Sequence, residues 1–147
     1  MRISSPAFRN NEKIPSRYTC DGTNVSPPLA IEEVPAGAKS LAFVVYDPDA
    51  PNGMFVHWVA YNIVPTGPTL KIGERAAPGT QGLNSNKRRA YIGPCPPSGS
   101  HRYFFKAYAL NDKLQQDSSM DKTSLERAIY GHVIAEAEFV ATYEKTK

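Results

Sequence analysis

Leu41-Ala42-Phe43-Val44-Val45-Tyr46 carries apolar side chains on both of its alternating faces. Successive side chains of a β-strand point to opposite sides, so this segment predicts a strand that is covered on both faces. The segment from Tyr103 to Leu110 has the same character, with Lys106 as its only charged residue. Two strands of this kind indicate a sheet in the middle of a layered domain.

Two more segments predict long strands. For the strand over Val56 to Ile63, simple alternation places Trp58, Ala60 and Asn62 on one face and His57, Val59, Tyr61 and Ile63 on the other. Residues 135–143 alternate between small or aromatic side chains and more polar ones. Weaker strand signals occur at Arg2 to Ser4, Leu29 to Glu33 and Ala90 to Gly93.

A single helix is expected near the C-terminus. Thr123 suits its N-cap, and Glu126 three residues later completes a capping box. An apolar stripe follows, and Gly131 is placed to end the helix. The polar, glycine-containing stretch from Lys71 to Arg89 is expected to form one long loop.

The length and composition predict a single globular domain. The chain has 147 residues, of which 41% are hydrophobic and 21% charged, and this excludes a disordered chain. With 13 prolines and 10 glycines, many short strands are separated by turns. We therefore expect an all-β fold, an antiparallel β-sandwich of two sheets with one or two short helices, as one domain over residues 1–147.

The charge and hydropathy patterns exclude several classes of protein. A net charge of +3, with the basic residues scattered, is too small to indicate nucleic-acid binding. No apolar run approaches the roughly 18 residues of a membrane-spanning helix. Residues 1–14 lack the apolar core, about 7–15 residues long, of a signal peptide, so we expect a cytoplasmic protein.

Polar side chains gather where two of the apolar segments begin or end. Asp47-Pro48-Asp49-Ala50-Pro51 follows the first strand, and Gly93-Pro94-Cys95-Pro96-Pro97 leads through Ser98-Gly99-Ser100 to His101-Arg102-Tyr103. Prolines fix φ and remove N–H donors, so both loops are expected to be rigid. Polar clusters at two strand ends predict one shared pocket.

The two cysteines, Cys20 and Cys95, leave two alternatives open. They have neither CxxC spacing nor histidines at metal-ligand spacing, which argues against zinc. In a reducing cytosol they would be free, partly buried thiols. Alternatively, a disulfide would tie the loop around Cys20 to the proline-rich loop.

The acids and histidines near these loops also raise the question of catalysis. Asp47, Asp49, His57 and His101 could form a general acid–base pair or a metal site. However, the chain contains no Gly-x-Ser-x-Gly elbow, and the prolines beside the acids indicate a rigid turn. We expect no enzyme activity, no cofactor and no metal.

Together these motifs resemble the phosphatidylethanolamine-binding protein family, also called the Raf kinase inhibitor protein family. The signatures are the Asp47–Pro51 segment with His57-Trp58 and the Gly93–Pro97 segment with His101-Arg102-Tyr103. Thr19-Cys20-Asp21-Gly22 and Gly131-His132-Val133 are similar to the prokaryotic branch. The resemblance extends from about Phe8 to Tyr143.

The resemblance implies a β-sandwich with Greek-key connections and a small anion-binding pocket. Phosphate and phosphoethanolamine headgroups belong to the family's ligand class. Carried over to this sequence, the ligand-binding residues are Asp47, Asp49, His57, Tyr91, Pro96, His101 and Tyr103. We expect His57 and His101 to provide donors and positive charge, with Asp47 holding His101 protonated and oriented. Arg102 points away from Tyr103 and is expected to support the loop.

The predicted function is binding of a small phosphate-like anion, with a regulatory role through protein interaction. The alternative is inhibition of a serine protease or a kinase through exposed loops, for which the basic stretch from Lys71 to Arg89 is the candidate. The resemblance also implies a homodimer.

Overall fold

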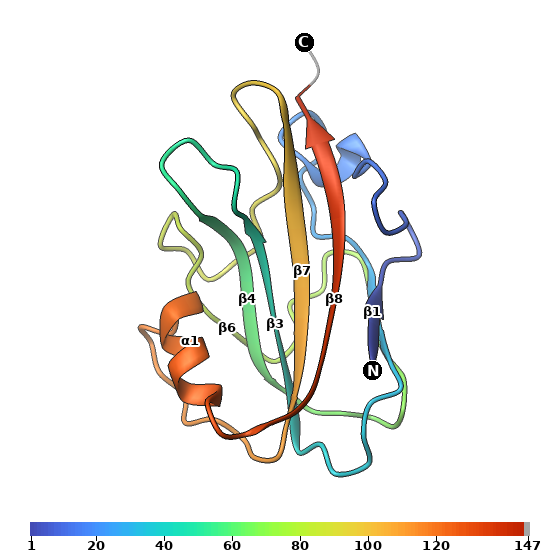
Figure 1. The fold of residues 1–147 in the computed structure, drawn as a ribbon, viewed down its shortest axis with the longest axis vertical. Helices are drawn as coiled ribbons and strands as arrows, with labels where there is room; N and C mark the ends of the chain where they lie inside the picture. The colour runs from blue at the N-terminus through green and yellow to red at the C-terminus, as the bar shows by residue number, and fades with distance from the viewer. Residues whose placement is uncertain (146–147) are drawn as a thin grey trace.

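The computed structural model describes residues 1–145, and it consists mainly of strands in two antiparallel sheets (Figure 1). The larger sheet has the order β6-β4-β3-β7-β8, with bounds Thr80–Gln81, Phe55–Ile63, Ser40–Asp47, Ser100–Leu110 and Val133–Glu144. The smaller sheet has the order β1-β2-β5, with bounds Arg2–Ser4, Leu29–Glu32 and Leu70–Ile72. The predicted all-β fold of two antiparallel sheets is confirmed.

The order of the strands explains the expected Greek-key character. After β6, at one edge of the larger sheet, the chain passes β4 and β3 and forms β7 on the far side. Such a crossing between non-neighbouring strands is typical of Greek-key sheets. It also brings the start of β7 beside the end of β3, so the two predicted polar clusters meet (Figure 1).

The apolar faces of β3 pack into two separate cores. Phe43 and Val45 lie in the core between the two sheets, together with the fully buried Trp58. On the opposite face, Val44 packs in a second core with Leu125 of α1 (Lys122–Ile129). Burying a side chain of this size contributes about 2 kcal/mol, so covering both faces stabilises the central strands.

The helix begins two residues earlier than the sequence pattern predicts. Asp121 is the N-cap, and its carboxylate accepts from the backbone N–H of Ser124 at 2.9 Å. The predicted capping box of Thr123 and Glu126 is therefore wrong, because the preceding aspartate already satisfies the helix N-terminus. Gly131, with φ of 83°, follows the helix end, as its sequence position indicated.

Two bulges interrupt the alternation of β4. Val45 pairs with Trp58 but Tyr46 pairs with Val56, so His57 is an extra residue in the strand. A bulge turns neighbouring side chains to the same face, and the His57 ring accordingly packs on Tyr103, a member of the core that contains Trp58. The predicted separation of His57 and Trp58 onto opposite faces is wrong for this reason.

The second bulge lies near the other end of β4. Leu41 pairs with Ile63 and Phe43 with Ala60, which leaves one residue too many, and Asn62 adopts a φ of 53°. Ile63 thereby joins the core between the sheets, while the Asn62 side chain donates to the carbonyl of Leu114 on the other side. Both residues lie on the faces opposite to those predicted by strict alternation.

The loops also depart from the sequence prediction. The stretch from 71 to 89 includes the end of β5 and all of β6, and residues 90–93 form no strand. A short 3-10 helix, η1 (Ser16–Tyr18), lies beneath the proline-rich loop. Residues 1–145 contain no helix long and apolar enough to cross a membrane.

Candidate functional site

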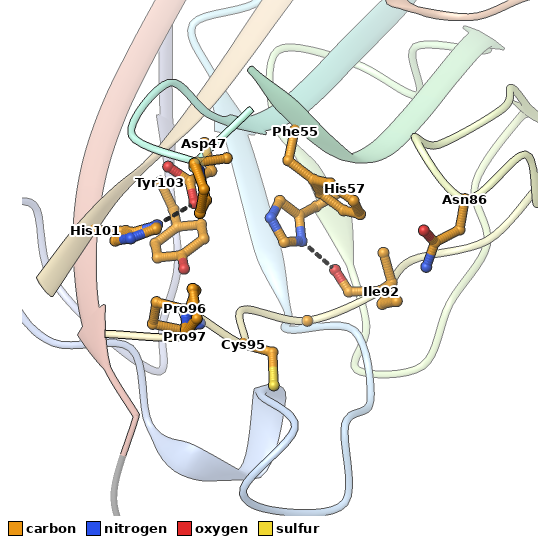
Figure 2. Close-up of a pocket in the computed structure, with 13 residues that line it drawn as sticks. Asp47, Phe55, His57, Asn86, Ile92, Cys95, Pro96, Pro97, His101 and Tyr103 are labelled. Atoms are coloured by element: carbon orange, nitrogen blue, oxygen red, sulfur yellow. Dashed lines mark hydrogen bonds and ion pairs between the residues drawn. The ribbon is translucent and has the colours of Figure 1, made fainter. Parts of the chain in front are cut away.

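A cavity of about 270 Å³ opens where β3 ends and where β4 and β7 begin (Figure 2). β3 contributes Asp47, β4 contributes Phe55 and His57, and β7 contributes His101 and Tyr103. The proline-rich loop, residues 92–97, forms the facing wall. The two predicted polar clusters therefore surround one pocket.

Asp47 and His101 form a buried pair on one side of the cavity. Nδ1 of His101 lies 2.6 Å from Oδ2 of Asp47, and the two side chains are only 9% and 4% exposed. The other carboxylate oxygen of Asp47 accepts from the backbone N–H of Asp49 at 2.7 Å. Because a carboxylate accepts, Nδ1 carries the proton, and this fixes the orientation of the imidazole ring.

His57 lies across the cavity and has a different environment. Its Nδ1 donates to the carbonyl oxygen of Ile92 at 2.7 Å, since a carbonyl can only accept. Burial lowers the pKa of His57 to about 4, which outweighs the attraction of the Asp47 carboxylate. His57 is therefore neutral at neutral pH, and the expectation that it provides positive charge is wrong.

Tyr103 lies between the two histidines. Its ring centre is 5.3 Å from that of His57, edge-on, and 6.5 Å from that of His101. Burial, together with the negative charge of Asp47, raises the pKa of the phenol above its ordinary value. The hydroxyl thus stays protonated across the physiological range and can act as a hydrogen-bond donor.

The proline-rich wall is anchored from behind. Pro96 and Pro97 face the cavity, and Cys95 forms a disulfide with Cys20, the second of the two alternatives that the sequence left open. The N–H of Cys20 also donates to the carbonyl of Pro94 at 3.1 Å. At Gly93, a Cβ would come within 2.3 Å of the Tyr18 carbonyl oxygen, so the close approach of the two loops requires glycine.

Asp49 was predicted to bind ligand, but the structure gives its carboxylate another partner. Oδ1 and Oδ2 accept from Nη2 and Nε of Arg102 at 2.8 and 2.9 Å, and Oδ2 also accepts from the backbone N–H of Arg102. These hydrogen bonds lower the pKa of Asp49 to about 2. Asp49 does not line the cavity, and it acts on the site through its own N–H, which holds Asp47.

Tyr91 was also predicted to bind ligand, and the structure places it outside this cavity. The Tyr91 hydroxyl donates to the carbonyl of Tyr18 at 2.6 Å, and its ring packs edge-on against Trp58 at 5.2 Å. Tyr91 borders a separate cavity of about 250 Å³. The neighbouring Ile92 lines the pocket instead, and residues 90–93 form no strand. In all, the structure brings together five predicted residues, namely Asp47, His57, Pro96, His101 and Tyr103.

Comparison with known proteins places this geometry in a family. The family model described as phosphatidylethanolamine-binding protein matches residues 4–144. The chain belongs to the phosphatidylethanolamine-binding protein family. A UPF0098 protein from Methanothermobacter thermautotrophicus is 43% identical, and the match covers 99% of both chains. A UPF0098 protein from Chlamydia trachomatis is 42% identical over 99% of both chains.

Solved structures of the phosphatidylethanolamine-binding protein family agree with this assignment. A putative homologue from Chlamydia trachomatis superposes with a TM-score of 0.93 at 42% identity, covering 99% of this chain and 97% of that one. YbcL of E. coli, described as a member of the mammalian family, gives a TM-score of 0.88 at 31% identity, with 99% and 98% covered.

Sequence reasoning missed several cavity residues of this phosphatidylethanolamine-binding protein family member. Phe55 precedes His57 by two residues, so the period of a strand could have identified it. Asn86 comes from the distant stretch before the proline-rich loop, and no local pattern points to it. Residues 1–145 contain no group of three or more His, Cys, Asp or Glu side chains arranged to hold a metal.

Proposed function

We propose that the protein binds a small phosphorylated anion in the cavity between Asp47, His57, His101 and the proline-rich loop. The observation that carries this proposal is the buried hydrogen bond of 2.6 Å between Asp47 and His101. Because Nδ1 of His101 is already hydrogen-bonded to Asp47, Nε2 is the nitrogen that remains available to a ligand. When His101 is protonated, Nε2 offers a charge-assisted donor, worth about 1.5–3 kcal/mol.

Tyr103 supplies the second donor. Its raised pKa keeps the hydroxyl protonated, and the residue is only 1% exposed, so Tyr103 offers a hydrogen bond in a poorly solvated place. Phe55, Pro96 and Pro97 exclude water from the same space, which strengthens polar contacts to a bound anion. Together these groups suit one compact phosphate.

The size and the lining of the cavity favour binding over turnover. About 270 Å³ accommodates a phosphate with a short substituent, but not an acyl chain. Among the described residues that line it there is no Ser, Thr or Lys, and its cysteine is in a disulfide. We infer that the protein acts as a binding module and that it regulates a partner protein, as the sequence predicted.

A titration of the amide NMR signals would test this function. Inorganic phosphate or phosphoethanolamine, added at pH 6, is expected to shift the signals of Asp47, His101 and Tyr103. His101→Asn should weaken the binding at least tenfold, because it removes the charge-assisted donor. The matched control is His132→Asn, because His132 is a partly buried histidine that bonds to Asn111 away from the cavity. Absence of shifts, or equal binding by the His101 variant, would overturn the proposal.

A second candidate function, protease inhibition, rests on the shape of the loop around residues 84–90. The buried Asn84 side chain accepts from the N–H groups of Asn86 and Arg88 and donates to the carbonyl of Ala90. This network holds three exposed basic residues, 87–89, in a fixed loop. Trypsin-like enzymes would be the target class. An Arg88→Ala variant that inhibits as well as the parent protein, or a parent without inhibition, would exclude this role.

A further inference from the structure

The cavity presents hydrogen-bond acceptors as well as donors. Nδ1 of His57 gives its proton to the Ile92 carbonyl at 2.7 Å. A neutral imidazole has only one N–H, so Nε2 of His57 carries a lone pair. Figure 2 shows this second nitrogen on the side of the ring that faces Tyr103 and His101, away from Ile92. A ligand in the cavity therefore meets an acceptor at His57.

Asp47 adds to this acceptor character. Its two oxygens accept hydrogen bonds from Asp49 N–H and from His101 Nδ1, and the carboxylate also interacts with the Tyr103 hydroxyl. A carboxylate has about four lone-pair sites, so acceptor capacity remains at the cavity wall. A fully deprotonated anion would place its own lone pairs against those of His57 and Asp47, at a cost in binding energy.

We propose that the cavity selects a phosphate group that still carries one proton, with its P–OH donating to Nε2 of His57 and its anionic oxygens accepting from His101 and Tyr103. This inference rests on the proposed function and specifies its ligand as a phosphomonoester. A monoester monoanion has both an O–H donor and charged acceptors. Sulfate and phosphodiesters, including the diester linkage of a phospholipid headgroup, have no such proton near neutral pH.

The groups around His57 keep it in the required state. The titratable groups that face it are Asp47 from the end of β3 and His101 and Tyr103 from β7, while the loop contributes the uncharged Ile92. Burial is the largest effect and opposes a charged His57, as does a charged His101, whereas the hydrogen bond to Ile92 and the charge of Asp47 favour it. With a pKa of about 4, His57 keeps its lone pair in any solution above about pH 5.

A comparison of four probes tests the selectivity on the unmodified protein. At pH 5.5, calorimetric or NMR titrations would measure phosphoethanolamine, inorganic phosphate, sulfate and dimethyl phosphate. The first two are expected to bind about 10- to 100-fold more tightly than the last two, which leave the His57 acceptor without a donor. Equal affinities would overturn the inference while leaving the proposed function intact. If none of the four binds, both proposals fail.

The pH dependence gives an independent result with its own control. The second pKa of a phosphomonoester is about 6, so phosphoethanolamine loses its last phosphate proton between pH 5.5 and 8. Inorganic phosphate keeps one proton over that whole range. Any change in the protein affects both ligands alike, so the ratio of the two affinities isolates the proton on the ligand. The affinity of phosphoethanolamine relative to phosphate should fall about tenfold, and a constant ratio would contradict the inference.

A variant can assign the selectivity to His57. His57→Gln places an amide in the site, which can turn either its oxygen or its NH₂ toward a ligand. Sulfate should then bind nearly as well as phosphate, while His132→Gln should retain the discrimination of the parent protein. If a folded His57→Gln protein still discriminates as the parent does, His57 is not the selecting group. If the variant fails to fold, the four-probe comparison decides alone.

Discussion

Asp47 and His101 are 54 residues apart in sequence, and their side chains meet at 2.6 Å inside the protein. The contact joins the last residue of β3 to the second residue of β7. It therefore links the two loops of the cavity and also fixes the ring that would contact a ligand. Its removal should affect both stability and binding.

Asp47→Ala should reduce the free energy of unfolding by about 3 kcal/mol, because it leaves a buried imidazole and the Asp49 N–H without their acceptor. Urea denaturation at pH 7 would measure this loss. Asp47→Asn should lose less, since an amide oxygen can still accept. Asp49→Ala is the control, because its ion pair with Arg102 is exposed and worth only about 0–1 kcal/mol. A loss for Asp47→Ala no larger than that of Asp49→Ala would contradict the prediction.

The stability of the protein should depend on pH through His57. Its pKa is about 4 in the folded protein and 6.5 as the reference value for an unfolded chain. Between these values the unfolded chain binds the extra proton, so stability is complete above pH 6.5 and decreases as the pH falls toward 4. The decrease amounts to about 3 kcal/mol if no other group contributes.

The measurement for His57 is the urea midpoint between pH 7 and pH 4. Asp47, His101 and Tyr103 also face this cavity, so the comparison with a His57→Gln variant is necessary to isolate the contribution of His57. That variant should show a smaller decrease over the same range. If the two proteins lose stability equally as the pH falls, His57 is not the buried neutral base described above.

Tyr91 and Tyr103 should respond differently to the same change. Tyr91→Phe removes the hydrogen bond to the Tyr18 carbonyl and should cost about 1 kcal/mol of stability, without changing phosphate affinity. Tyr103→Phe removes a donor from the cavity and should weaken phosphate binding about fivefold or more. Thermal denaturation and phosphate titration of both variants would show whether stability and binding separate in this way.

The disulfide between Cys20 and Cys95 should contribute strongly to stability. It closes a loop with a sequence separation of 75 residues, and a link of that length stabilises a protein by about 4 kcal/mol. A double Cys20→Ser, Cys95→Ser variant should lose this amount in urea denaturation. A thiol reductant should reduce the stability of the parent protein but leave the variant unchanged. A parent protein insensitive to reductant would argue for free thiols.

Local patterns were sufficient for the long strands but not for the short strands or for the site. Runs such as Leu41 to Tyr46 predict their strands because burial on both faces leaves an apolar sequence. The faces of β4 could not be predicted, because a bulge depends on how Trp58 and Val56 pair with β3. Likewise, the inclusion of Tyr91 came from likeness to relatives, whereas its actual partner is a carbonyl 73 residues away in the chain.

Arg102 is a residue whose position the local pattern did predict. Strand alternation from Tyr103 predicted that its side chain would point away from the ligand and support a loop, and the structure places it on Asp49. The sequence did not predict that the Asp49 carboxylate bonds to Arg102, because a position beside a proline does not reveal which partner a carboxylate meets. The positions of Asp49 and Tyr91 are therefore determined by contacts with residues far away in the sequence, and local propensity does not reveal them.

The anchoring of the proline-rich loop has a consequence for how ligands are distinguished. Prolines restrict its backbone, a disulfide and the Cys20–Pro94 hydrogen bond fix its position, and Gly93 lies directly against the Tyr18 backbone. The wall of the cavity is therefore preorganised, and little binding energy is spent on rearranging it when a ligand binds. Differences in affinity among small anions should then report their own hydrogen-bonding chemistry, which makes this cavity a fixed template for comparing them.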